Sequence, residues 1–542
     1  MAHDPSNACG VDPDHGANTL VRGLARGFIV VLLAVFLSPV QWVNRDPSKL
    51  SAGGYLPPAV RVLKKVAYDL RGVDAERNPK IVAENLKAGT DAWVIKPGRH
   101  NGRIEGYADR VSTSADQRVT LFVSTTEKTF VVEAYRMGFY GGSGGRLVWR
   151  SSRIRGMLQL GQSRDPGTNM VEAPWNASLS FNVDPDWTPG VYLLKLNASS
   201  RVQSYVPLTV RDDKSNAALV IQNSVLTWQA YNRWGGYSLY EGPKKDRAHR
   251  SKIVSFDRPY SADGSADFFG AEFPLVSFVE SLGLDVTYWT DIDLHEQPSR
   301  LLQHRALITL GHDEYWSRNM RRGAETARDK GVNLAFLGAN AVFRHIRLEA
   351  SGLGADRRIV NYRVAKQDPL FGIDDSQVTV NWREFPLLEP EDSLVGQSYE
   401  CNPVHADAAI DDASSWLFEG TGIRSGDRIK GLIGYEYDRV NPARQMPEGL
   451  QILAHSPVSC RNRRSFSDVT YYSAPSGAGV FASGTTAWIC TLTASCPKGP
   501  HGPPDVRFLL MNVNLLRAFA KGPVGLEHPS RSNLERFGLS AN

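Results

Sequence analysis

The chain has 542 residues, of which 42% are hydrophobic and 10% aromatic, so it can bury sizeable cores and is not intrinsically disordered. Its formal charge of +5 comes from 62 basic and 57 acidic residues scattered along the chain, without a Lys/Arg stripe. This charge pattern argues against a nucleic-acid partner.

The first predicted element is the apolar run Gly27–Val40, which follows Arg22 and Arg26. The run is long for a buried strand and slightly short of the roughly 20 residues of a bilayer span, so it is typical of a signal or transmembrane helix. We expect residues 1–45 to form a cytosolic tail and an uncleaved signal anchor, with the globular part outside the cytoplasm. A cleaved signal peptide and a secreted product are the alternative. Residues 46–91 would form a linker or stalk.

Strand signals dominate residues 92–212. Apolar residues alternate with polar ones in Val119–Val123 and Val191–Leu196, and the turn Gly141–Gly145 separates such runs. A period of two between glycine-rich turns is typical of strands with one buried face. We therefore predict an N-terminal β-sandwich.

Strands alternate with helices over residues 213–523. The predicted strands are Ala218–Ile221, Leu284–Tyr288, Leu307–Leu310, Asn333–Leu337 and Gly479–Ala482, and the predicted helices are Glu272–Leu282, Ser317–Lys330 and Val506–Ala520. This alternation predicts a doubly wound α/β domain with a parallel sheet. Residues 357–444 are poorly periodic and are predicted to be an insertion or a β-rich extension, and residues 524–542 a C-terminal tail. The fold class is thus α+β multidomain.

The strand Leu307–Leu310 ends in Gly311 and the run His312-Asp313-Glu314. In open α/β sheets ligands bind beyond the carboxyl ends of the strands, where these proton-active and metal-capable side chains would project. Asn340 follows the next strand along the chain. The alternative is that the acidic run caps a helix and solvates a loop.

An aromatic stretch, Thr227–Tyr240, follows the first strand of the α/β domain and carries five rings around the turn Gly235-Gly236. It would open onto the same edge of the sheet as His312 and Asn340. Trp228 and Trp234 are the candidate substrate-binding residues within it.

Four of the five cysteines lie in the C-terminal part of the chain, beyond the predicted anchor. They are Cys401, Cys460, Cys490 and Cys496. An even number in an exported chain allows two disulfides with three connectivities, and Cys490–Cys496 would close a small loop. Free buried thiols are the alternative. The spacing fits no zinc module.

Five motifs resemble the large (β) subunits of N,N-dimethylformamidase and their relatives. They are YRMGFYGGSGGR (Tyr135–Arg146), WQAYNRWGGYSLY (Trp228–Tyr240), VSFDRPY (Val254–Tyr260), GHDEYWS (Gly311–Ser317) and FLGAN (Phe336–Asn340). The resemblance implies a β-sandwich joined to a domain similar to class I glutamine amidotransferases. It also implies one non-haem iron held by two tyrosines and a glutamate, and hydrolysis of small N-substituted amides.

Carried onto this chain, the resemblance implies Glu314 as the carboxylate ligand and Tyr231 and Tyr192 as the phenolates. Tyr237 and Tyr240 compete with Tyr231 for its place. Tyr192 has a purely structural alternative, because a tyrosine at a strand start in a sandwich also fits a tyrosine corner.

The same carry-over makes His312, Asp313 and Asn340 the catalytic candidates around an iron-activated water that attacks the amide carbonyl. His312 would pass a proton to the departing amine, and Asn340 would hold the developing oxyanion. The amidotransferase comparison argues against thiol chemistry, because the strand-end segment Leu310–Trp316 holds no cysteine, and the predicted α/β domain has no G-x-S-x-G elbow that would offer a serine instead.

Two other functions stay open at this stage. One is a non-catalytic cell-envelope protein that binds carbohydrate or another polymer on Trp228 and Trp234. The other is a metal-free acid/base enzyme of the sugar-utilisation α/β type, using His312 and Glu314. The expected partners of the hydrolase are a small amide substrate, the membrane through the N-terminal helix, and a second copy or a small partner subunit.

Overall fold

The computed structural model describes residues 77–493 and 504–539. They form a mixed α and β structure in which strands outweigh helices. The described residues fall within one compact unit, and the division predicted near residue 212 stays a prediction. The predicted anchor Gly27–Val40 lies outside the described residues. Within the described ranges, no helix is both long and apolar enough to span a membrane.

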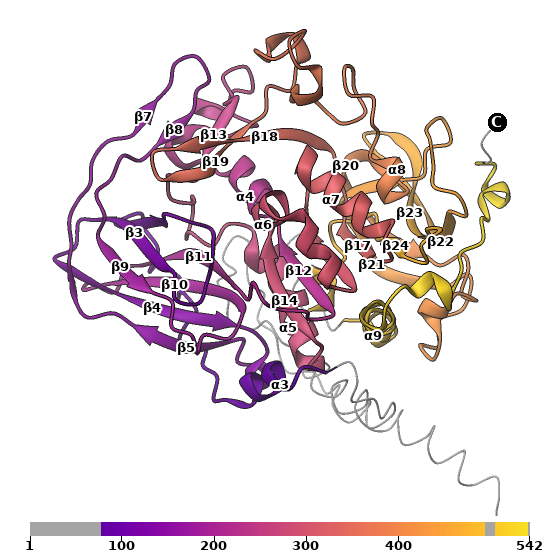
Figure 1. Ribbon diagram of the computed structural model, residues 1–542, viewed down its shortest axis with the longest axis horizontal. Coiled ribbons are helices and arrows are strands. Elements are labelled where there is room, and N and C mark those ends of the chain that lie inside the picture. The colour runs from indigo at the N-terminus through magenta and orange to yellow at the C-terminus, as the bar shows by residue number, and fades with distance from the viewer. Residues whose placement is uncertain (1–76, 494–503, 540–542) are drawn as a thin grey trace, which may run out of the picture. The chain divides into compact units, whose positions relative to one another are not determined.

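Two antiparallel-rich sheets pack together in the N-terminal part of the described chain, where the alternating pattern predicts strands (Figure 1). The larger has the order β2-β11-β10-β4-β5, with β6 beside β4, and the smaller has the order β1-β3-β9. The strands are β1 Ile104–Ala108, β2 Ser112–Ser114, β3 Arg118–Thr125, β4 Thr129–Met137, β5 Gly145–Arg150, β6 Ile154–Arg155, β9 Leu179–Asn182, β10 Gly190–Ala198 and β11 Gln203–Arg211. Val119 and Leu121 from the smaller sheet share one core with Val132, Leu194 and Leu208 from the larger.

The central sheet of the rest of the chain has seven strands in the order β14-β12-β15-β17-β24-β23-β22. They are β12 Leu219–Asn223, β14 Val286–Thr290, β15 Ala306–Gly311, β17 Asn333–Gly338, β22 Gln451–Cys460, β23 Arg463–Ser473 and β24 Gly479–Ala482. The first five in spatial order are parallel, and β23 and β22 add on antiparallel. The chain starts at β12, moves outward to β14 and then returns to β15 on the other side. The strand order therefore reverses between β12 and β15, which is the switch point where α/β sheets bind ligands.

Helices join these strands. They are α4 Val225–Tyr231, α5 Phe273–Leu282, α6 Asp291–Glu296, α7 Arg318–Arg328 and α9 Val506–Lys521. The helices α5, α7 and α9 lie where the sequence predicts helices, whereas α4 and α6 were not predicted. α7 begins at Ser317, whose side chain accepts a hydrogen bond from the Met320 amide, as an N-cap should. α5 ends at Gly283 in the left-handed conformation, with φ of 68°.

Smaller ladders complete the fold. β13 (Ile253–Ser255), β19 (Gly354–Val360), β18 (Arg344–Ser351) and β16 (Tyr315–Ser317) form a four-stranded sheet near α4, and β7 (Ser163–Arg164) pairs with β8 (Val171–Glu172) (Figure 1). Within residues 357–444, α8 (Asp392–Val395) precedes the long antiparallel pair β20 (Ser398–Ala409) and β21 (Arg428–Arg439).

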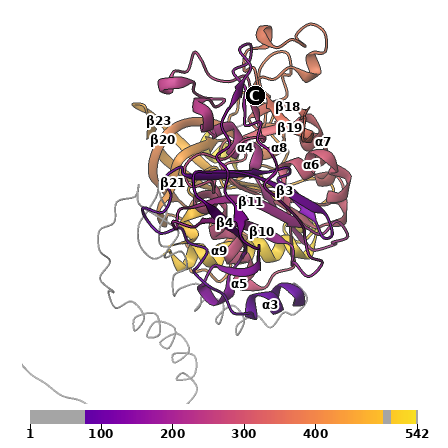
Figure 2. The ribbon, with the colours of Figure 1, turned by 90° about the vertical axis from the view of Figure 1, so that its left-hand side faces the viewer.

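A buried ion pair joins the N-terminal sheets to the central domain. Arg136 on β4 donates to Glu280 on α5 through two nitrogens, at 2.6 and 2.9 Å, and both side chains are fully buried. Glu280 also accepts from Asn85 of helix α3 (Pro79–Leu86) and from Tyr288 on β14. Figure 2 looks onto β4 and β10 with α3 below them. The carboxylate therefore links four elements, and its charge is fully compensated.

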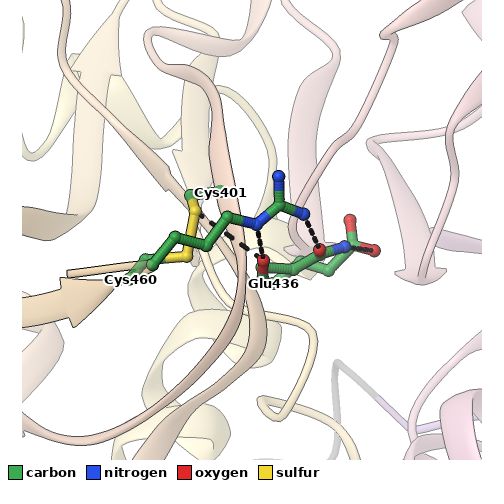
Figure 3. The surroundings of a disulfide bond; sticks show 5 residues. Cys401, Glu436 and Cys460 are labelled. Carbon is green, nitrogen blue, oxygen red and sulfur yellow. Dashed lines mark hydrogen bonds between the residues drawn. A yellow bond between two sulfur atoms is a disulfide. The ribbon is translucent and has the colours of Figure 1, made fainter. Parts of the chain in front are cut away.

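One of the predicted disulfides is present. Cys401 on β20 and Cys460 at the end of β22 are bonded, with 6.3 Å between their Cα atoms. The bond lies beside Glu436 of β21 (Figure 3). The predicted pairing of Cys490 with Cys496 lies outside the described residues, because Cys496 is not among them.

Candidate active site

The site lies at the switch point of the central sheet. Tyr231 is the last residue of α4, which follows β12, and Glu314 follows β15, which pairs with β12. Parallel neighbours end at the same edge, so the two segments meet beyond the carboxyl ends of their strands. The amide of Glu314 donates to the Thr227 hydroxyl at 3.1 Å, which fixes the loop against α4.

Two phenols converge on one carboxylate oxygen. The hydroxyls of Tyr231 and Tyr240 donate to Oε2 of Glu314 at 3.0 and 2.5 Å. The two rings stack with their centroids 4.2 Å apart and an interplanar angle of 25°. Three side-chain oxygens that could ligate a metal ion, from separate segments, thus lie together. We call Tyr231, Tyr240 and Glu314 the Tyr–Tyr–Glu cluster.

The remaining oxygen of Glu314 is held by an arginine. Arg344 donates from Nε to Glu314 Oε1 at 3.1 Å, and the carboxylate is 1% exposed. Burial opposes ionisation of this group, but the charges of Arg344, His312 and Arg363 and the Tyr240 hydrogen bond together hold the pKa of Glu314 below its ordinary value. Glu314 is therefore an ionised carboxylate in a water-poor setting.

Burial has the opposite consequence for the phenols. Desolvation, reinforced by the negative charge of Glu314, raises the pKa of both Tyr231 and Tyr240 well above the usual 10. In the cluster as it stands, both tyrosines therefore keep their protons and share them with Glu314.

A second carboxylate faces the cluster across His312. Nε2 of His312 lies 3.5 Å from Glu314 Oε2 and 3.5 Å from Glu436 Oε2. Asn340 donates from Nδ2 to Glu436 at 3.0 Å and lies 3.4 Å from the same ring nitrogen of His312. Asn402 donates to the other oxygen of Glu436 at 2.8 Å. A partly exposed histidine thus stands between two acids, in the arrangement that proton transfer needs.

Backbone geometry at the ends of β15 and β17 explains their glycines. A Cβ on Gly338 would lie 1.7 Å from the Gly311 carbonyl oxygen, so the two strands can approach this closely only because Gly338 has no side chain.

The backbone of Asn340, just beyond β17, is held by an acid. Asn340 adopts a φ of 61°, and its amide donates to both carboxylate oxygens of Asp438, at 2.8 and 3.0 Å. Asp438 on β21 thereby holds Asn340 in a conformation that non-glycine residues rarely adopt.

The structure brings four of the predicted site residues together: Tyr231, Glu314, His312 and Asn340. It places Asp313 differently, because the Asp313 carboxylate is 2% exposed and accepts from Gln222 on β12 rather than joining the cluster. Burial raises the pKa of Asp313 to about 7. The predicted catalytic role of Asp313 therefore finds no contact to support it.

The assignment of Tyr192 to the same ligand set is corrected by the structure. Tyr192 lies on β10 in the core between the two N-terminal sheets, where its ring stacks on Trp187 at 4.8 Å. Its hydroxyl donates to the Thr188 carbonyl at 2.7 Å. This bond a few residues upstream is the purely structural role that the sequence also allowed. Tyr240 takes the position that Tyr192 was expected to fill.

Replacing Tyr192 with phenylalanine should lower the free energy of unfolding by about 1 kcal/mol, because the Thr188 carbonyl loses one of its two hydrogen bonds and keeps only the one from Arg136. Bound metal and activity should stay at wild-type values. Urea denaturation and metal analysis of the purified variant would check both. A loss of metal without a loss of stability would return Tyr192 to the site.

The predicted substrate contacts of Trp228 and Trp234 are also corrected. Trp228 is 4% exposed, and its indole nitrogen donates to Glu272 at 2.9 Å. Trp234 packs edge-on against Trp175 and donates to Glu105 at 2.7 Å. Both rings serve packing, because their polar ends are tied inward to carboxylates.

Sequence reasoning missed Glu436 and Asn402, which both come from the poorly periodic segment 357–444. Glu436 lies in the alternating stretch Gly434–Arg439, which reads as an ordinary strand. Arg344 follows the FLGAN motif closely but was not singled out. These residues could be identified only from the pairing of strands that are distant in sequence, and local periodicity gives no information about such pairing.

The donor set of the Tyr–Tyr–Glu cluster fits a hard, highly charged cation. Two phenolic oxygens and a carboxylate are the hard ligands that trivalent iron prefers, and both phenol protons already point at the single atom that a cation would approach. Among residues 77–493 and 504–539, no three His, Cys, Asp or Glu side chains gather to hold a metal ion. The cluster differs from such a group because two of its donors are tyrosines.

Comparison with protein families identifies the chain. The profile described as N,N-dimethylformamidase beta subunit-like, C-terminal, matches residues 131–501, which is more than half of the chain. The chain belongs to this family. The match spans β4 to the end of the central sheet and so covers every residue of the Tyr–Tyr–Glu cluster together with His312, Asn340 and Glu436. Membership in the dimethylformamidase-like family supports an amide-hydrolase-like role.

Other comparisons add little. No curated protein matches this member of the dimethylformamidase-like family. Among solved structures, a cycloisomaltooligosaccharide glucanotransferase from Paenibacillus sp., complexed with cycloisomaltoheptaose, is 13% identical with a TM-score of 0.14. That match covers 22% of this chain and 15% of the other, so the chain spans only a small part of that enzyme. A similarity of this size carries no argument about fold or function.

Proposed function

We propose that this chain hydrolyses small N-substituted amides, with a mononuclear non-haem iron held by Tyr231, Tyr240 and Glu314. The observation that carries the proposal is the convergence of two phenol groups on one oxygen of Glu314 at the switch point of the sheet. Family membership supplies the reaction class, and the convergence of three oxygen donors supplies a place for the ion.

Iron bound there would act as a Lewis acid toward the amide carbonyl and would activate a water molecule. Each remaining task falls to a residue of the chain. His312, 3.5 Å from both Glu314 and Glu436, is placed to receive a proton from the attacking water and to deliver it to the departing amine. Glu436 orients His312 and stabilises its protonated form.

Asn340 lies 3.4 Å from His312, and its amide would turn from Glu436 toward the carbonyl oxygen as negative charge develops. The reaction consumes one water and releases a carboxylic acid and an amine. His312 and Arg344 are partly exposed and Glu314 is buried, so the substrate would approach the cluster from the side of His312 and Arg344.

Replacing Tyr240 with phenylalanine should remove bound iron and lower the rate of dimethylamine release from N,N-dimethylformamide by roughly 10- to 100-fold or more, because one ligand and its contact with Glu314 are lost. Iron content and initial rates of the purified protein would be compared with those of wild type. Tyr237→Phe is the matched control, because Tyr237 lies on the same loop and its ring contacts Arg164 instead.

Equal iron content in the Tyr240→Phe variant and in wild type would contradict the ligand assignment. Hydrolysis by protein from which iron has been removed would contradict the role of the metal and favour an acid/base enzyme working through His312 and Glu314.

We also propose that the chain works outside the cytoplasm, anchored by its N-terminal helix or secreted after cleavage. The apolar run Gly27–Val40 supports export, and the Cys401–Cys460 disulfide is of the kind that persists in oxidising compartments. Fractionation of cells followed by N-terminal sequencing distinguishes an anchored chain from a cleaved one. The proposed partners are a small amide substrate and either a second copy or a small subunit, with no nucleic acid.

A further inference from the structure

Three arginines gather beside the Tyr–Tyr–Glu cluster. Arg344 binds Glu314 Oε1, and Cζ of Arg363 lies 4.2 Å from the centroid of the Tyr240 ring. Arg363 also donates to the Tyr315 hydroxyl at 2.8 Å. Arg250 precedes Ser251, whose amide donates to the Ser238 carbonyl, so this third arginine is held against the loop that carries Tyr240.

Two of these guanidinium groups have no carboxylate partner in the described part of the chain. Arg363 makes its hydrogen bond to a neutral phenol, and its Nε is buried without any hydrogen-bond partner. The side chain of Arg250 donates only to the Arg247 carbonyl, at 3.4 Å. Glu314, the acid in this group, is already taken by Arg344 and the two tyrosines. Positive charge is therefore in excess at this side of the cluster.

Arg250 is the arginine that this excess affects. Desolvation, followed by repulsion from Arg363 and Arg344, lowers the pKa of Arg250. Like charges in a partly buried setting cost free energy unless an anion compensates them, and a buried guanidinium N–H without a partner is costly in the same way. Perturbed groups of this kind cluster at binding and catalytic sites.

We propose that Arg250 and Arg363, assisted by Arg344, form an oxyanion-binding subsite that takes a carboxylate carried by the substrate. The arginine fork donates two parallel hydrogen bonds, a geometry that matches the two oxygens of a carboxylate. The inference that the molecule bearing this carboxylate is an amide rests on the proposed function. Substrates would then be amides with an acidic arm, which binds beside Tyr240 while the amide group reaches the Tyr–Tyr–Glu cluster.

Calorimetric binding of glutarate to the full-length protein tests the subsite without any need for turnover. Wild type should bind glutarate, and Arg250→Gln and Arg363→Gln should each weaken binding by roughly 10- to 100-fold, as expected for a charge-assisted hydrogen bond. Arg247→Gln is the control, because Arg247 is an exposed arginine of the same loop. Arg250 packs less tightly than Arg363, so its variant remains informative if Arg363→Gln fails to fold.

Equal glutarate binding by wild type, Arg250→Gln and Arg247→Gln would overturn the subsite. Binding of inorganic phosphate but not glutarate would also overturn it, because the site would then serve a free tetrahedral anion. Glutaramide, which is neutral, should not compete with glutarate, and competition would contradict a charge-based site.

A pair of substrates separates this inference from the proposed function. N,N-dimethylsuccinamate carries a carboxylate, and N,N-dimethylbutyramide is its neutral counterpart. Preferential hydrolysis of the first, lost in Arg250→Gln through a higher KM at unchanged kcat, supports both proposals. Glutarate binding with no hydrolysis of either amide would keep the subsite and reject the amide hydrolase. Equal hydrolysis of both amides would keep the hydrolase and reject the subsite.

Discussion

Replacing Arg136 with methionine is expected to lower the free energy of unfolding by about 3–5 kcal/mol, because the change leaves the carboxylate of Glu280 buried without its cation. Arg136 and Glu280 are both fully buried and share two hydrogen bonds between β4 and α5. The side chains of Asn85 and Tyr288 would still donate to Glu280, but neither carries a charge. Urea denaturation followed by circular dichroism would measure the loss.

A matched control lies one strand away. Arg150 on β5 pairs with Glu133 at 3.4 Å and is 61% exposed, so Arg150→Met should change stability by less than about 1 kcal/mol. The double variant Arg136→Met/Glu280→Leu removes both charges and should recover most of the loss. A single variant as stable as wild type would mean that the pair does not join the two parts of the structure.

Replacing Glu314 with glutamine should abolish tight iron binding and lower amide hydrolysis by at least about 100-fold, since changes outside the direct ligands already cost 10- to 100-fold. The neutral amide removes the charge that Arg344 and the two tyrosines share. The NH2 group of the glutamine would also face either a phenol hydroxyl or Arg344. Both of these groups donate hydrogen bonds to the carboxylate, so the NH2 group would meet another donor instead of an acceptor. Iron analysis and initial rates on N,N-dimethylformamide would be measured on the same preparation.

Glu241→Gln is a suitable control for Glu314→Gln, because Glu241 follows Tyr240 directly and pairs with Arg233 at the surface. It should bind iron and turn over substrate as wild type does. Full iron content in the Glu314→Gln variant would remove the carboxylate from the ligand set and leave the two tyrosines without a role at an ion.

The five parallel strands of the central sheet could be predicted because each one carries its own local signal, whereas the antiparallel strands β22 and β23 were not predicted. Buried parallel strands are continuous apolar runs, as in Ala306–Gly311, and the helices carry caps such as Ser317 and Gly283. The position of β24 between β17 and β23 could not be predicted in the same way. It depends on pairing between segments that are distant in sequence.

The candidate site was predictable where a side chain directly follows a strand or its first helix. Glu314, in the loop after β15, meets that condition, and Tyr231 was assigned through the family resemblance. Tyr192 fits its motif only because its hydroxyl donates to Thr188 in the turn before its own strand. Tyr237 and Tyr240 both lie in the segment after α4, and only the folded chain shows that Tyr240, together with Tyr231, reaches Glu314. Glu436 lies on β21, and the sequence of that strand contains no motif that indicates a catalytic residue.

The place of β24 in the sheet bears on how the chain folds as it is synthesised. β17 ends at Gly338, but the parallel neighbour that covers its open side begins only at Gly479. Until that late segment leaves the ribosome, the backbone N–H and C=O groups of β17 have no strand on that side, and an uncovered strand edge is a template for aggregation. Long-range parallel pairing of this kind is slow to form. A nascent chain halted before Gly479 would therefore expose the middle of its own sheet and depend on chaperones to stay soluble.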